Sequence, residues 1–99
     1  MPSLKTQYVI KMRLRRSSER LRALREELRV IDEQAMYLTD DAEDLQTRAI
    51  VSDSPLARSE AREAGGHAGA MRRHRAHVVA EIAELEARQD ALLDRLSGA

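Results

Sequence analysis

Cysteine, tryptophan and phenylalanine are missing from this sequence, and two tyrosines are its only aromatic residues. The lack of cysteine excludes a disulfide framework and a thiolate metal site, so nothing argues for an oxidising compartment. With so little aromatic material, a chain of 99 residues holds one domain at most and can hardly build an ordinary globular core. No run approaches the roughly 18 apolar residues of a membrane span. We therefore expect a cytoplasmic protein.

Catalytic motifs are also missing. The sequence has no phosphate-cradling glycine loop, no Gly-x-Ser-x-Gly and no His-Glu-x-x-His. We expect no enzymatic activity, no cofactor and no small-molecule substrate. Lysine is scarce, with two lysines beside fifteen arginines, and this ratio is typical of high-G+C genomes and favours a bacterial source.

What the sequence does contain is a long seven-residue repeat. Charged residues make up 34% of the chain, as in long helices and coiled coils. From Ile10 onward, eleven of twelve repeat positions are apolar, which indicates a coiled coil because this spacing keeps one seam facing a partner helix. The a positions hold Leu14, Leu21, Leu28, Ala35, Ala42 and Ala49, and the d positions hold Ile10, Ser17, Leu24, Ile31, Leu38 and Leu45.

The repeat stops at VSDSPLA, where Ser54 suits a helix cap and Pro55 suits the first position of a new helix. A second repeat follows, with Ala57, Ala64, Met71, Val78, Leu85 and Leu92 at d and Ala61, Ala68, Arg75, Ile82, Gln89 and Leu96 at a. If the chain reverses around Asp53, each a residue faces a d residue, and the one wholly polar layer pairs Ser17 with Gln89. We predict an all-α fold, an antiparallel two-helix coiled-coil hairpin with an N-terminal overhang at 1–9, helices at 10–51 and 56–97 and a turn at 52–55.

The predicted seam is thin, because alanines line it near the turn and alanine buries little apolar area. We therefore expect a second hairpin to complete a four-helix bundle. Apolar residues off the seam are the candidate interface: Tyr8, Val9, Met12, Val30, Met36, Tyr37, Val79 and Leu93, with Ile50 as a further such residue.

Glycines and histidines interrupt the second helix between Gly65 and His77. Gly65, Gly66 and Gly69 each cost about 0.5–1 kcal/mol against alanine, so residues 65–69 form a predicted weak point that is either a hinge or a tolerated weakness. His67, His74 and His77 lie off the seam without converging carboxylates. We expect solvated histidines, His67 beside Asp41, and no metal site.

Charge is unevenly distributed. Residues 1–29 hold nine basic and three acidic residues, whereas residues 30–63 hold three basic and nine acidic ones. This polarity favours an antiparallel homodimer in which unlike halves meet. The basic stripe consists of Lys11, Arg13, Arg15, Arg16, Arg20, Arg22, Arg25 and Arg29.

We interpret the chain as a non-catalytic protein–protein interaction or adaptor module that binds itself, a larger bacterial protein, or both. The alternative is a hairpin that uses the basic stripe at residues 5–29 to bind nucleic acid or to regulate RNA polymerase. In outline the hairpin resembles the coiled-coil arm of bacterial transcript-cleavage factors, in which tip carboxylates meet the polymerase's metal. Only Asp53 lies in the turn here, and Asp40, Asp41, Glu43 and Asp44 lie further back along the first helix.

Overall fold

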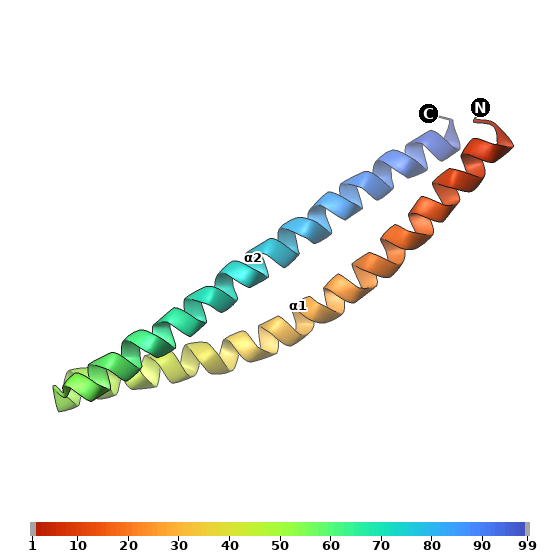
Figure 1. The fold of residues 1–99 in the computed structure, drawn as a ribbon. Coiled ribbons are helices and arrows are strands. Elements are labelled where there is room, and N and C mark those ends of the chain that lie inside the picture. The colour runs from red at the N-terminus through yellow and green to blue at the C-terminus, as the bar shows by residue number, and fades with distance from the viewer. Residues whose placement is uncertain (1, 99) are drawn as a thin grey trace. The chain divides into compact units, whose positions relative to one another are not determined.

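The computed structural model describes residues 2–98, and nearly all of them are helical. Helix α1 spans Leu4–Ser52 and helix α2 spans Pro55–Ser97, with no strand in this range. The two helices form a hairpin (Figure 1), so the predicted all-α hairpin is confirmed. Dimerisation into a four-helix bundle stays a prediction.

Helix α1 begins earlier than the repeat suggests. Residues 4–9, expected as an overhang, are helical, because Ser3 caps the first turn. Its Oγ accepts the N–H of Thr6 at 3.2 Å, and its carbonyl accepts the N–H of Gln7 at 2.8 Å. The seven-residue pattern marks only residues that face a partner helix, so it gives no signal for this first turn.

The turn between the helices consists of Asp53 and Ser54. Asp53 has a left-handed backbone conformation, with φ of 49°, and its N–H donates to the carbonyl of Ala49 at 3.2 Å, which ends α1. Its Oδ1 accepts a hydrogen bond from Arg58 at 2.8 Å. Ser54 Oγ accepts the N–H of Ala57 at 3.4 Å, and Pro55 is the first residue of α2. The chain therefore reverses over two residues, each tied to the start of α2 or the end of α1.

The described residues divide into two compact units. Unit 1 contains residues 2–27 and 78–98, and unit 2 contains residues 28–77. The core of unit 1 is aliphatic, with Ile10, Leu21, Leu24 and Val78 buried and Leu24 fully so. Each of these residues occupies a seam position of the repeat, so the apolar pattern itself selects the core.

The core of unit 2 is made mainly of alanines. Ala42, Ala64 and Ala68 form a buried cluster against which Leu38 and Leu45 pack. Ile31 and Ala61 are the other buried residues of this unit. A methyl group buries little area, so an alanine layer of unit 2 contributes less to stability than a leucine layer of unit 1.

Helix α2 runs without a break through the glycine segment. A Cβ at Gly65 or Gly66 would meet no atom within 4 Å, and one at Gly69 would meet the Arg73 guanidinium at 3.4 Å. No close approach within the chain therefore requires glycine at 65 or 66.

Replacing Leu24 tests the core of unit 1. Leu24→Ala should lower the free energy of unfolding by about 2–5 kcal/mol, because it leaves a cavity at a fully buried position. Circular-dichroism melts measure the effect. The matched control is Leu4→Ala in the same unit, where the side chain is 84% exposed and the change should stay within about 0.5 kcal/mol. Equal melts for the two variants would contradict this packing.

Replacing two glycines tests the weak point. Gly65→Ala combined with Gly66→Ala should raise the free energy of unfolding by about 1–2 kcal/mol, because alanine is the better helix former and the added methyl groups meet open space. Urea denaturation followed by circular dichroism gives the value. Gly98→Ala is the control and should give no gain, since Gly98 has a φ of 79°. A destabilised double variant would mean that this segment needs glycine.

Candidate functional site

One concave surface of unit 1 is a groove rimmed by arginines. It has a volume of about 530 Å³, and most of its exposed surface is apolar. Leu85, Ala91 and Leu92 supply its aliphatic residues. We call it the arginine-rimmed groove; its lining residues are Arg13, Arg16, Ser17, Arg20, Leu85, Arg88, Ala91, Leu92 and Arg95.

Helical spacing brings these arginines together. Arg13, Arg16 and Arg20 are three and four residues apart, which places them on one face of α1. Arg88 and Arg95 are seven residues apart and share a face of α2. The hairpin register predicts Arg20 near Arg88 and Arg13 near Arg95, and all four do line this one groove.

Carboxylates neutralise only part of this positive charge. Arg20 Nη2 donates to Glu81 Oε1 at 2.9 Å, and Arg88 pairs with Glu84 one turn before it. Arg13, Arg16 and Arg95 make no ion pair with any residue between 2 and 98. The groove therefore combines an apolar surface with three guanidinium groups that lack an acidic partner in this range.

The polar layer of the seam differs from the sequence prediction. Gln89 Nε2 donates to Ser18 Oγ at 3.0 Å, rather than pairing with Ser17. The Ser17 hydroxyl oxygen is buried and has no hydrogen-bond partner among the described residues. The reason is that Ser18 lies beside the seam, where the long Gln89 side chain reaches it at the surface.

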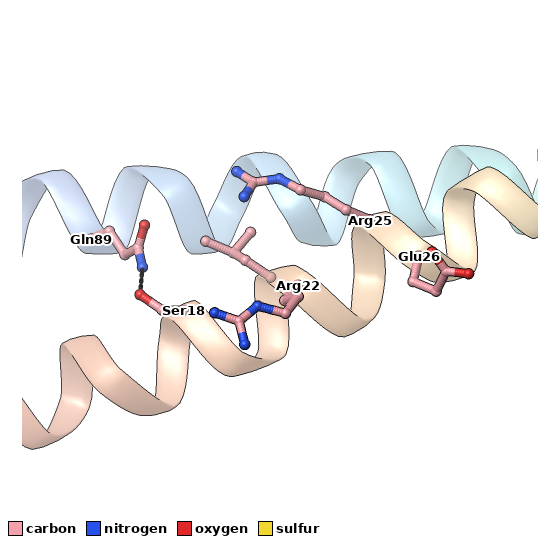
Figure 2. Close-up of a pocket in the computed structure, with 6 residues that line it drawn as sticks. Ser18, Arg22, Arg25, Glu26 and Gln89 are labelled. Atoms are coloured by element: carbon pink, nitrogen blue, oxygen red, sulfur yellow. Dashed lines mark hydrogen bonds between the residues drawn. The ribbon is translucent and has the colours of Figure 1, made fainter.

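A second groove in unit 1 has a more polar lining. Its volume is about 450 Å³, and Figure 2 shows Arg22 and Arg25 on α1 together with the hydrogen-bonded Ser18–Gln89 pair. Leu21 and Glu26 complete the lining. We call this surface the polar groove.

The predicted basic stripe is therefore not one continuous surface. All eight of its residues are exposed. Arg13, Arg16 and Arg20 line the arginine-rimmed groove, whereas Arg22 and Arg25 line the polar groove. Lys11 and Arg15 line neither groove, and Arg29 belongs to unit 2, where it pairs with Glu33 at 2.7 Å.

Unit 2 presents exposed apolar and acidic residues on α1. Met36 is 64% exposed and Tyr37 is 75% exposed. The carboxylates that follow, which are exposed and make no ion pair with any residue between 2 and 98, are Asp40, Asp41, Glu43 and Asp44. We call residues 36–44 the acidic segment.

Apolar side chains are also exposed next to the turn. Ile50, Val51 and Leu56 are 83%, 82% and 67% exposed. The sequence analysis names Ile50 but not Val51 and Leu56, because these two residues lie where the repeat ends. The available signal was their apolar character at positions outside a and d.

The other predicted interface residues lie at different depths. Tyr8, Val9, Val30, Val79 and Leu93 are exposed, whereas Met12 is partly buried. Val9 also lines a small groove with Ile10. Met12 is consequently the least accessible of the predicted interface residues.

His67 lies beside Asp41, as the sequence predicts, but it pairs with a different carboxylate. His67 and Asp41 line the same small groove of unit 2, and His67 Nε2 lies 3.7 Å from Glu63 Oε1, one turn earlier on α2. The i, i+4 spacing on one helix places Glu63 within easier reach than a residue across the seam. Within residues 2–98, no three His, Cys, Asp or Glu side chains are grouped closely enough to hold a metal ion.

A charged residue also occupies the seam of unit 2. Arg75, at an a position, turns its guanidinium to Asp32, and Nε donates to Oδ1 at 2.6 Å. This hydrogen bond, and secondly the carboxylate's charge, raise the pKa of Arg75 above its usual value. The arginine thus remains charged while it bridges the two helices at the surface.

Neither helix of the described chain combines the length and apolar character needed to cross a membrane. Comparison of the chain with protein-family models, curated proteins and solved structures gave no match.

Removing the unpartnered hydroxyl tests the polar layer. Ser17→Ala should raise the free energy of unfolding by about 1 kcal/mol, because it removes a buried polar atom that has no partner and adds a better helix former. Ser18→Ala is the matched control and should give less or no gain, since it also deletes the hydrogen bond with Gln89. Urea denaturation compares the two, and a loss of stability in Ser17→Ala would contradict the assignment.

Proposed function

We propose that this chain is a non-catalytic protein–protein interaction module that self-associates as an antiparallel homodimer in the bacterial cytoplasm. The observation that carries the proposal is the balance of apolar residues. Among residues 2–98, eleven large apolar side chains are substantially exposed, whereas the core has nine buried residues, of which four are alanines. A thin core beside so much exposed apolar surface favours burial against another chain.

Charge supports the same proposal. Within residues 2–98, Arg13, Arg16 and Arg95 of unit 1 have no acidic partner, and the carboxylates of the acidic segment of unit 2 have no basic partner. Two copies in which unlike units meet bring these charges together, and such complementarity sets orientation more than affinity. Apolar contact supplies most of the binding free energy, because exposed ion pairs contribute only about 0–1 kcal/mol each.

Docking on a larger protein belongs to the same proposal. The exposed residues Ile50, Val51 and Leu56 next to the turn offer an apolar surface separate from the grooves of unit 1. An adaptor needs two such surfaces, one for self-association and one for its partner.

Nucleic-acid binding is the second candidate. The unpaired guanidinium groups of Arg13, Arg16 and Arg95 favour it, since a phosphate backbone would neutralise them. Against it, Tyr8 is the one aromatic residue among residues 1–29 for stacking on bases, and the arginine-rimmed groove is mostly apolar. We therefore rank it below self-association.

Replacing one exposed tyrosine in each unit tests self-association. Tyr8→Ser combined with Tyr37→Ser should raise the dissociation constant of the dimer by about tenfold or more, because each substitution removes a large apolar contact. Sedimentation equilibrium over a range of protein concentrations, up to tens of micromolar, measures the dissociation constant.

The matched control places serine at two exposed small residues, one in each unit. Ala70→Ser combined with Ala83→Ser should leave the dissociation constant unchanged, because both alanines are exposed and lie outside the acidic segment and the grooves. A parent chain that stays monomeric at every concentration would overturn the proposed function.

A further inference from the structure

We propose that the arginine-rimmed groove of unit 1 is the docking site for the acidic segment, residues 36–44, of a second copy of this chain. The inference rests on the proposed self-association and names the two surfaces that meet. It follows from three features of the described residues: charge, spacing and apolar surface.

Charge identifies the class of occupant. Arg13, Arg16 and Arg95 lack a carboxylate partner within residues 2–98, so an anionic occupant would lose no existing ion pair on binding. The acidic segment is in the complementary condition, since its four carboxylates pair with no cation in the same range. Each surface therefore supplies the counter-charge that the other lacks.

Spacing fits one helix face to the other. Arg13, Arg16 and Arg20 follow one another at intervals of three and four residues, and Tyr37, Asp40 and Asp44 repeat the same intervals. On an α-helix both sets form a single row about two turns long. A row of one tyrosine and two carboxylates can thus follow the row of three arginines over its full length.

The apolar surface selects a polypeptide over a simple polyanion. The groove is mostly apolar, with Leu85, Ala91 and Leu92 in its lining. Met36 and Tyr37, both strongly exposed, lie within a turn of the first carboxylates and supply the side chains to cover it. A phosphate backbone would satisfy the arginines but leave the leucines in contact with water, so the acidic segment fits better than nucleic acid.

A charge swap between the two surfaces tests the proposal. Arg16→Glu should weaken the dimer at least tenfold, because it places a carboxylate opposite the acidic segment, and Asp40→Arg should do the same for the opposite reason. Mixing the two variants, or combining them in one chain, should restore the dissociation constant to within about threefold of the parent, since the pair is then reversed. Sedimentation equilibrium measures each constant, and circular-dichroism melts establish that every variant is folded.

The matched control is Arg22→Glu, which makes the same charge change on the same helix but in the polar groove. It should weaken the dimer by less than about threefold, through long-range charge alone. Weakening as large as that of Arg16→Glu would mean that overall charge, and not this groove, governs binding.

A cross-link locates the contact independently of affinity. A benzophenone amino acid in place of Tyr37, in an isotopically labelled copy mixed with unlabelled chain, should form intermolecular cross-links to peptides containing residues 85–95. Cross-links elsewhere in the second copy, or a charge swap that restores nothing, would overturn the proposal while leaving self-association standing. A parent chain that is monomeric would overturn both this proposal and the proposed self-association. A dimer indifferent to Arg16→Glu, with duplex DNA binding that this variant abolishes, would assign the groove to nucleic acid and overturn the proposal.

Discussion

One seam between two helices organises everything else in this structure. A pair of helices can bury only the residues that face each other, which are two positions in every seven. Buried residues such as Leu24 and Ala64 satisfy that requirement, and the other five positions of each repeat must lie beside the seam or face outward. Residues that line the grooves, such as Arg16 and Arg88, occupy these other positions, so the repeat that selects the core also places them at the surface.

The two units fill the same seam in different ways. Unit 1 uses leucine, isoleucine and valine, and Gln89 of its polar layer donates a hydrogen bond to Ser18, just beside the seam. Unit 2 uses mainly alanine. Its charged seam residue, Arg75, donates a hydrogen bond to Asp32 at the surface, between the two helices. In both units a polar residue at a seam position finds its partner at the edge, where water screens the cost of an imperfect pairing.

The sequence predicts the hairpin, the turn around Asp53 and most of the core, because apolar spacing alone decides which residues can meet. It also predicts that four arginines come together, since the register in which each a residue faces a d residue fixes every neighbouring position. The sequence does not predict the contacts that depend on the length and reach of individual side chains. The cap formed by Ser3 extends α1 by a turn and a half without any apolar signal, and the reach of a side chain decides that Gln89 bonds to Ser18 and that His67 meets Glu63. The groove itself has no linear signature, because its lining joins residues 13–20 to residues 85–95.

The rim of the groove contains arginine and no lysine. A guanidinium group does not lose its proton at any pH that a cell reaches, and it offers no amine for acetylation. No histidine, the side chain that commonly acts as a pH switch near neutrality, lines the groove either. Acylation of lysine, one way for a cell to cancel positive charge, therefore has no target on this surface. In the proposed dimer, dissolved salt is the condition that sets how strongly the charge of the groove acts.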